Sequence, residues 1–309
     1  MSDARAIVFA YHDVGVRCLK ALLSAQVAVP LVVTVRDDPR ENRWFGSVAD
    51  TAREYGLPLA MPDDANSGEF PERVAQLQPD FIFSFYYRSM LGAPLLRSAR
   101  LGALNIHGSL LPKYRGRAPV NWAILNGERE TGATLHYMVE RADAGDIVDQ
   151  LSVPILEDDD ALTVFGKVTA AAEIVLARSL PGLIAGNAPR RPQPIEPGQY
   201  FGRRTAADGR IDWSQPAVRI HNLVRAVAPP FPGAFTEVDG RQWWIHRTRV
   251  EPGVIAPSDR ARLFGAQGAC FAACRDGGVL RILAAATADG PADLAQLALE
   301  LEARPVMLG

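Results

Sequence analysis

The sequence is poor in cysteine and has no long apolar run. Its three cysteines are Cys18, Cys270 and Cys274, an odd and sparse set that suits neither a disulfide framework nor a zinc site. We expect all three thiols to be reduced and to serve in packing. Nothing approaches the roughly 18 consecutive apolar residues of a membrane span, and the N-terminus lacks the parts of a signal peptide. We therefore expect no membrane insertion and a cytoplasmic location.

An excess of positive charge is also missing. The formal net charge is −2, whereas a protein that grips nucleic acid needs a basic face, so we expect no nucleic-acid partner. The densest basic stretch, Lys113 to Arg117, indicates a small anion site or a solvated loop. The five histidines are spread without ligand spacing, so we expect no metal site. His136 falls inside a predicted strand and is interpreted as a packing histidine.

A dinucleotide-binding fingerprint is absent as well. The first strand-to-helix turn, Ala10 to Gly15, holds a single glycine where G-x-G-x-x-G would place three. Without those glycines the backbone cannot approach a pyrophosphate closely, which argues against an NAD- or FAD-dependent oxidoreductase.

The first half of the chain alternates short buried strands with helical patterns. The predicted strands are Ala6 to Ala10, Val29 to Val35, Phe81 to Phe85, Ala103 to His107, Ala133 to Val139 and Ile147 to Val153. The predicted helices are Val14 to Ala25, Ser47 to Tyr55, Pro71 to Leu77, Ala118 to Asn126 and Ala161 to Leu180. Because parallel strands need helical crossovers, the pattern predicts an α/β domain over residues 1–187, with a doubly wound, mainly parallel sheet.

The composition changes after this domain. Glycine and proline break any regular pattern, which predicts an interdomain linker over residues 188–204. Beyond it come one helix, near Val218 to Val227, and short alternating segments such as Ala234 to Val238, Trp243 to Ile245 and Val279 to Leu283. This second pattern predicts a small OB-like β-barrel over residues 205–309.

The strand Ala103 to His107 ends with polar side chains. Asn105 and His107 share one face because side chains alternate along a strand, while Leu104 and Ile106 lie on the other. In open α/β sheets, ligands bind beyond the carboxyl ends of the strands. From spacing alone, these side chains either serve a ligand site or satisfy buried loop groups.

The loop after this strand favours a ligand site, because its sequence resembles that of a known family. Asn105-x-His107-x-Ser-Leu-Leu-Pro-x-Tyr-Arg-Gly, taken with the later Arg141-Ala-Asp143-Ala-Gly-Asp146, is similar to the signature of folate-dependent formyltransferases. The similarity runs over essentially the whole chain. It is strongest to the formyltransferase part of the bacterial enzymes that formylate UDP-4-amino-4-deoxy-L-arabinose for lipid A modification, a process linked to polymyxin resistance. The segments that carry this closer likeness are Phe9 to Asp13, Phe83 to Arg88, His107 to Pro119 and Phe201 to Thr205.

The resemblance implies a catalytic trio. His107 would be the acid, Asn105 would stabilise developing charge, and Asp143 would tune the histidine. The chemistry agrees: when a neutral amine attacks a formyl carbon, negative charge develops on oxygen, where positioned N–H donors act strongly. A carboxylate close to an imidazole favours its protonated form. Taken alone, Asp143 before Ala144-Gly145 would be a turn-forming aspartate.

The same resemblance implies 10-formyltetrahydrofolate as co-substrate and no metal. Two loops and one arginine correspond to the folate-binding positions of the family: Ser89, Met90, Leu91, Val139, Glu140, Arg141, Ala142, Asp143 and Arg117.

The implied acceptor is a nucleotide-linked amino sugar. Residues at the ends of two strands and after the linker are candidates to bind it, namely Tyr11, His12, Tyr87, Arg88, Arg203 and Arg204. Three alternatives stay open: another amino sugar linked to UDP or dTDP, the tRNA of a methionyl-tRNA formyltransferase, and a catalytically silent folate- or nucleotide-binding regulator. Methionyl-tRNA formyltransferases usually carry a longer insertion, rich in glycine and lysine, after the second strand. Here the corresponding segment, Arg36 to Phe45, is short and mixed in charge, which disfavours a tRNA acceptor. A homo-oligomer, and the choice between an independent enzyme and part of a bifunctional one, also stay open.

Overall fold

The computed structural model describes residues 4–196, 200–256 and 260–308, with only the backbone at 254 and 255. The chain divides into two compact units that are not contiguous in sequence. The first comprises Met1–Pro119, Glu130–Pro154 and Phe165–Gly202, and the second comprises Val120–Arg129, Ile155–Val164 and Arg203–Gly309. The boundaries predicted at residues 187 and 204 stay a prediction.

The first unit is built on a seven-stranded sheet with the order β3-β2-β1-β4-β5-β7-β8. Its strands are β1 (Arg5–Ala10), β2 (Ala28–Val33), β3 (Leu59–Ala60), β4 (Phe81–Phe85), β5 (Gly102–His107), β7 (Glu130–Tyr137) and β8 (Ile147–Pro154). All pairs from β3 to β5 are parallel, whereas β5–β7 and β7–β8 are antiparallel. This confirms the predicted mainly parallel, doubly wound sheet.

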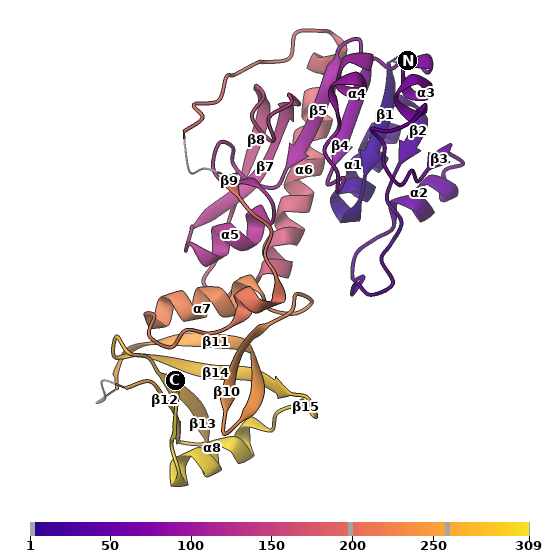
Figure 1. Cartoon of the computed structure of the whole chain (residues 1–309). Coiled ribbons are helices and arrows are strands. Elements are labelled where there is room, and N and C mark those ends of the chain that lie inside the picture. The colour runs from indigo at the N-terminus through magenta and orange to yellow at the C-terminus, as the bar shows by residue number, and fades with distance from the viewer. Residues whose placement is uncertain (1–3, 197–199, 257–259, 309) are drawn as a thin grey trace. The chain divides into compact units, whose positions relative to one another are not determined.

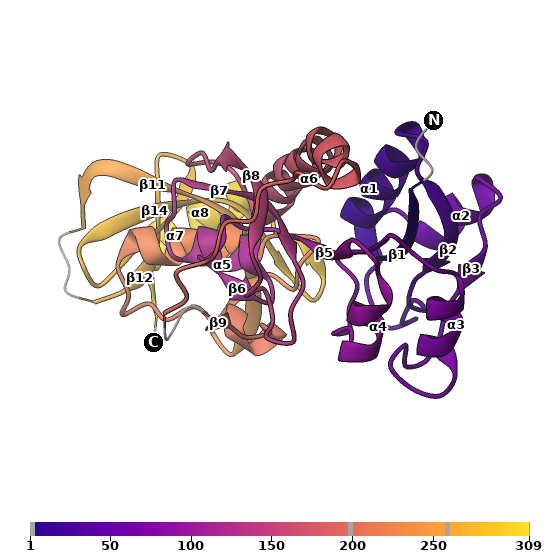
Figure 2. The same cartoon turned by 90° about the horizontal axis from the view of Figure 1, so that it is seen from above.

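Helices cover both faces of this sheet. The helices of the unit are α1 (His12–Ser24), α2 (Val48–Glu54), α3 (Phe70–Gln76), α4 (Ala93–Ser98) and most of α6 (Ala161–Ile184). Figure 2 shows α1 and α2 on one side of β1 and β2, with α3 and α4 on the other. Because both faces are covered, every residue of β4, Phe-Ile-Phe-Ser-Phe, is buried.

Helix α6 lies beside α1 and is fixed by two ion pairs. Arg17 Nε of α1 donates to Glu173 Oε2 at 2.7 Å, and Arg178 Nη2 donates to Asp149 Oδ1 of β8 at 2.9 Å.

The end of α6 differs from the prediction, which placed it at Leu180 and was wrong. The helix continues through Pro181 to Ile184. None of the described helices is long and apolar enough to cross a membrane.

The second unit carries an antiparallel sheet with the order β10-β11-β14-β13-β12-β16 and β15 beside β14. The strands are β10 (Ala234–Val238), β11 (Arg241–Ile255), β12 (Arg262–Ala266), β13 (Ala269–Ala273), β14 (Gly278–Thr287), β15 (Gly290–Pro291) and β16 (Val306–Met307). The helical elements are α5 (Pro119–Leu125, from Val120 on), a 3-10 helix (Ala206–Gly209), α7 (Ala217–Ala226) and α8 (Leu294–Ala303). The sheet curls into a half-barrel (Figure 1), which confirms the class of the predicted β domain.

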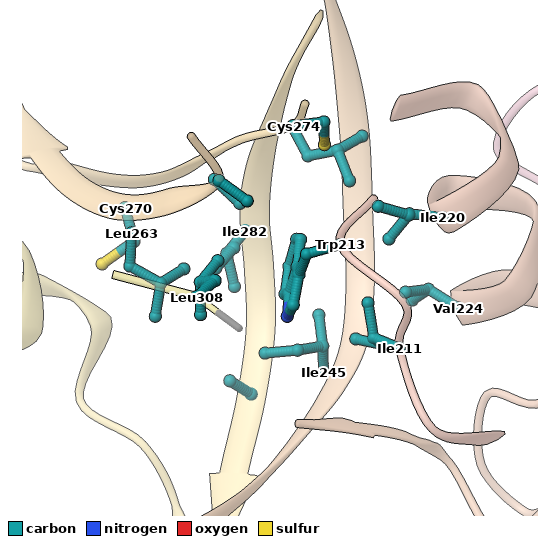
Figure 3. Close-up of a cluster of buried hydrophobic side chains, with 14 of the residues drawn as sticks. Ile211, Trp213, Ile220, Val224, Ile245, Leu263, Cys270, Cys274, Ile282 and Leu308 are labelled. Atoms are coloured by element: carbon teal, nitrogen blue, oxygen red, sulfur yellow. The ribbon is translucent and has the colours of Figure 1, made fainter. Parts of the chain in front are cut away.

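The core of this second unit surrounds Trp213. Figure 3 shows its ring among Ile211, Ile220, Ile245 and Ile282. The indole Nε1 donates to Thr236 Oγ1 at 2.9 Å, so the one polar atom of the ring is satisfied. Cys270 and Cys274 belong to the same core, and all three cysteines of the chain are free and buried, which confirms their predicted role in packing.

Candidate active site

Strand β5 brings two candidate side chains to the carboxyl edge of the first sheet. His107 is its last residue, and Asn105 precedes it by two, so both project to the same face. Asn105 lies opposite Ser84 of β4 and His136 of β7. The site is therefore anchored on a central strand rather than on loops alone.

Both ring nitrogens of His107 face protein acceptors. Nε2 donates to the main-chain oxygen of Tyr114 at 2.8 Å, and Nδ1 lies 3.5 Å from Asp143 Oδ1. The ring is buried, with a side-chain exposure of 7%. Two acceptors around one ring suit an imidazolium, which has an N–H on each nitrogen.

Asp143 reaches the histidine from the loop after β7. Its carboxylate accepts from Gly116 N–H at 2.9 Å and also lies 3.6 Å from His136 Nε2. Burial by itself would raise the pKa of this carboxyl, but the charge of His107, the contacts with His136 and the Gly116 N–H outweigh it and lower the pKa. The structure thus brings Asn105, His107 and Asp143 together around an ionised carboxylate.

His136 is a member of this cluster that the sequence interpretation missed. It was expected to be a packing histidine, and it is indeed buried. Its Nδ1 donates to the oxygen of Tyr137 at 2.8 Å, and its Nε2 lies 3.1 Å from Asn105 Nδ2. Its position depends on the antiparallel register of β5 and β7, so the only sequence signal was a histidine within a strand.

A second residue that was not selected is Arg115. It is only 3% exposed, yet its Nη1 has no hydrogen-bond partner among the described residues. Nε donates to the oxygen of Ala142, beside Asp143, at 3.3 Å. Burial, then Arg141, lowers the pKa of the guanidinium, while Asp143 acts in the opposite direction. A buried cation fits the small anion site that the basic stretch Lys113 to Arg117 indicated.

The two loops predicted to bind folate meet through a shared hydrophobic cluster. Leu91 is buried in that cluster, and Met138 packs against it. Met90 and Val139 expose 56% and 45% of their surface. Asn66 fixes the first loop, because its Nδ2 donates to Met90 O at 2.9 Å and its Oδ1 accepts from Gly92 N–H at 2.6 Å.

The remaining predicted folate-binding residues are mostly at the surface. The exposed ones are Ser89, Glu140, Arg141 and Arg117, and Ala142 is half-buried. Arg117 is held by its main chain, whose N–H donates to Phe201 O at 2.9 Å. Its side chain is exposed in the loop that follows His107.

The predicted acceptor-binding residues near β1 and β4 are engaged with each other. Tyr11 is buried and its hydroxyl donates to Asp37 Oδ1 at 2.7 Å. The Arg88 guanidinium lies 4.4 Å from the centre of the Tyr11 ring and pairs with Glu41 at 2.6 Å. Tyr87 is half-buried and packs edge-on against Phe9, with ring centres 5.3 Å apart.

His12 lies in an aromatic cluster instead of facing an open edge. Its ring stacks on Phe45 with centres 3.8 Å apart and meets Trp44 and Phe165 edge-on. Burial, then the charge of Arg88, lowers the pKa of His12 to about 3. The ring is therefore neutral at physiological pH.

Arg203 and Arg204 belong to the second unit. Arg203 is exposed. The Arg204 guanidinium lies 4.8 Å from the centre of the Trp122 ring, and its Nη2 donates to Asp208 O at 2.9 Å.

Backbone strain gathers at the carboxyl edge of the first sheet. Nine described residues other than glycine have a left-handed φ, and five of them lie around this edge, four in loops and one at the start of α1. They are His12 (68°), Tyr86 (59°), Tyr114 (56°), Ala118 (51°) and Asp143 (51°). Such strain concentrates at functional sites in proteins.

Across the described ranges, no group of three or more His, Cys, Asp or Glu side chains could hold a metal ion.

Comparison with known families places this site in context. The chain matches the formyl transferase family over residues 5–180 and the C-terminal domain of formyl transferases over residues 203–293. The chain belongs to the formyl transferase family.

Solved structures share its fold. The N-formyltransferase from Helicobacter canadensis, in complex with folinic acid and dTDP-3-aminofucose, aligns with a TM-score of 0.72 and 19% identity, covering 90% of this chain and 98% of the other. A 4-N formyltransferase from Francisella tularensis aligns with a TM-score of 0.64 and 21% identity over 78% of this chain and 96% of its own. HypX from Aquifex aeolicus, in complex with tetrahydrofolic acid, aligns with a TM-score of 0.62 and 20% identity over 93% of this chain and 45% of HypX.

Proposed function

We propose that this formyl transferase moves the formyl group of 10-formyltetrahydrofolate to the amino group of a nucleotide-linked amino sugar. The observation that carries the proposal is the approach of Asp143 Oδ1 to within 3.5 Å of His107 Nδ1, beside Asn105. An ionised carboxylate, an imidazole and an amide at one sheet edge form a set of groups suited to acyl transfer to an amine.

Each member of the trio has a separate task. One N–H of Asn105 is directed to His136, which leaves the second to stabilise the negative charge that develops on the formyl oxygen. His107 is favoured as the imidazolium by the neighbouring carboxylate of Asp143. Once its Nε2–H turns from Tyr114 O, it can give a proton to the departing folate nitrogen, and it recovers one from the attacking amine, so that no net proton is consumed. Asp143 stays ionised throughout, because its lowered pKa keeps it negative at neutral pH.

The loops around the trio fit a folate. Met90 and Val139 offer exposed apolar side chains in two loops that share a hydrophobic cluster. A flat heteroaromatic ring needs such apolar walls together with nearby main-chain polar groups. Folinic acid and tetrahydrofolic acid accompany two of the similar structures, which supports a folate in this chain too.

For the acceptor we propose the 4-amino group of UDP-4-amino-4-deoxy-L-arabinose. The support is the resemblance carried by Phe9 to Asp13, Phe83 to Arg88 and Phe201 to Thr205. This acceptor would place the protein in lipid A modification. A dTDP-linked amino sugar is the second candidate, because dTDP-3-aminofucose accompanies one of the similar structures.

A direct assay separates these acceptors. The protein is incubated with 10-formyltetrahydrofolate and, in parallel, UDP-4-amino-4-deoxy-L-arabinose, dTDP-linked 3- and 4-amino sugars, and methionyl initiator tRNA. Products are identified by mass spectrometry, with His107→Ala as the control for uncatalysed transfer. Formylation of UDP-4-amino-4-deoxy-L-arabinose with the highest kcat/KM is the expected result. A higher kcat/KM for a dTDP-linked sugar would identify that sugar as the acceptor instead. No transfer above the control would overturn the proposed activity and favour a silent binding protein.

A further inference from the structure

The chain that follows α6 runs back along the loop that carries Asp143. We call residues 188–196, together with β9 (Tyr200–Phe201), the strap. Arg191 and Ile147 exchange two main-chain hydrogen bonds, at 2.8 and 2.9 Å. The guanidinium of Arg190 lies 3.8 Å from the centre of the Tyr137 ring. Tyr137 and Ile147 flank the Asp143 loop, so the first part of the strap is fixed to both ends of that loop.

Gln193 makes the contact with the loop itself. Its Nε2 donates to the main-chain oxygen of Asp143 at 3.1 Å and to that of Gly145 at 2.6 Å. Both N–H groups of the carboxamide are therefore used on one turn. The turn is strained, since Asp143 has φ +51°, and tightly packed, since a Cβ at Gly145 would lie 2.0 Å from the oxygen of Tyr137.

The second part of the strap holds the other side of the site. Strand β9 pairs in parallel with β6 (Arg115–Gly116), and the ring of Phe201 lies 4.9 Å from that of Tyr114. The Tyr114 oxygen accepts from His107, and the Gly116 N–H donates to Asp143. The strap thus contacts both the loop that follows His107 and the loop that carries Asp143.

These contacts mean that the predicted interdomain linker is not only a connection. Residues 188–204 were expected to lack regular structure, but the Arg191 bridge and β9 belong to the first unit; residues 197–199 lie outside the described part. Main-chain carbonyls of a tight turn need donors, and the strap supplies them from outside the loop.

We propose that Gln193 is a positioning residue, which holds the main chain of Asp143 so that the carboxylate stays in register with His107. The inference rests on the proposed function for its kinetic consequences, but its geometric part does not depend on the acceptor. A carboxamide suits the task because it offers two donors on one atom, whereas a carboxylate of the same shape offers none. The charged and titratable groups that face Asp143 are His107 on β5, His136 on β7, Arg115 on β6 and Tyr86 after β4.

The test compares Gln193→Met, which keeps the length of the side chain, with Gln193→Glu, which keeps its shape. In both variants we expect kcat to fall by about 10- to 100-fold, as for small misplacements of reacting groups, with KM for both substrates within about twofold. The activity of Gln193→Glu relative to Gln193→Met should rise as the pH falls, because a protonated glutamic acid regains one O–H donor. Gln296→Met, at an exposed position of α8, is the matched control and should retain wild-type kcat.

A second measurement needs no substrate. The carboxyl carbon of Asp143, assigned by its loss in Asp143→Asn, is titrated by NMR in the wild type and in Gln193→Met. We expect its pKa to be higher in Gln193→Met, because contacts with His107, His136 and Gly116 that lower it are weakened. Unchanged titration together with kcat within twofold of wild type would overturn the inference. If the wild type formylates no acceptor but the titration shifts as expected, the proposed function fails and the positioning role of Gln193 stands.

Discussion

Asn105 and His136 face each other across β5 and β7, with Nδ2 of the asparagine 3.1 Å from Nε2 of the histidine. Because Nδ1 of His136 donates to Tyr137 O, Nε2 is the ring atom that faces the asparagine. This contact holds the amide nitrogen of Asn105 against β7. The histidine therefore orients the group proposed to stabilise the formyl oxygen.

Replacing His136 by leucine should uncouple this pair. The Asn105 amide would lose its partner inside the sheet, and we expect the free energy of unfolding to fall by about 1–3 kcal/mol. kcat should fall by at least about tenfold, because the donor is no longer oriented. Kinetics and urea unfolding of His136→Leu, Asn105→Ala and the double variant measure the coupling. Additive effects on kcat would show that the two side chains act independently.

The His107–Asp143 pair should give a pH-dependent loss of activity. His107→Ala should lower kcat by about 100-fold or more while the protein stays folded. Asp143→Asn removes the carboxylate that favours the imidazolium, so its activity relative to wild type should fall further as the pH rises. Formyl transfer measured between pH 6 and 9 tests this expectation, with circular dichroism to verify folding. A constant ratio of the two activities would contradict it.

Much of this site followed from local patterns. The period of two along a strand places Asn105 and His107 on one face without knowledge of the fold, and the doubly wound alternation places that strand at a ligand-binding edge. The loop motif then adds Asp143. The first two inferences use residues near each other in sequence, where local geometry restricts the answer, whereas the assignment of Asp143 rests on the resemblance of its loop to a family signature.

Features that depend on tertiary contacts were missed. His136 joins the cluster only because β7 pairs antiparallel with β5 in one register, and a shift of one residue would point it to the other face. Gln193 lies in a segment rich in proline, where composition indicates a linker, yet its partners lie 50 and 48 residues away. Strand β11 extends to Ile255, beyond the predicted Trp243 to Ile245. The extension includes Arg247 and Arg249, which are exposed on either side of the buried Thr248.

Tyr86 and Gly108 form a tight pair next to His107. The Tyr86 hydroxyl is buried without a hydrogen-bond partner among the described residues, and burial raises the pKa of the phenol. Tyr86→Phe should leave the free energy of unfolding unchanged or raise it by up to about 1 kcal/mol, because no hydrogen bond is lost. A clear loss of stability in urea unfolding would show that the hydroxyl has a partner.

Gly108→Ala tests the same contact from the other side. A Cβ at residue 108 would lie 1.9 Å from Tyr86 Oη and 3.1 Å from its Cζ, so we expect a loss of about 1–3 kcal/mol of unfolding free energy. Adding Tyr86→Phe removes the nearer atom and should recover part of that loss. The double-mutant cycle measures the recovery, and strictly additive changes would mean that the alanine is accommodated by movement elsewhere.

His12 should make the protein less stable in mild acid. Its pKa is lowered to about 3 by burial and then by Arg88, against roughly 6.5 in an unfolded chain. Between these values the unfolded state holds a proton that the folded state does not. Stability from this residue is therefore complete above about pH 6.5 and is lost as the pH falls towards 3, by at most about 1.4 kcal/mol per pH unit.

His12→Asn should remove this contribution. Asparagine tolerates the left-handed φ of 68° at this position, although the stack on Phe45 is lost, so the variant should be less stable at pH 7. Its free energy of unfolding should then fall less steeply than that of the wild type between pH 6.5 and 4.5. All other titrating groups are common to both proteins. Urea unfolding at half-unit pH intervals gives the two curves. Parallel curves would mean that His12 is protonated in the folded protein near its ordinary pKa, and hence that the aromatic cluster opens to admit the charge.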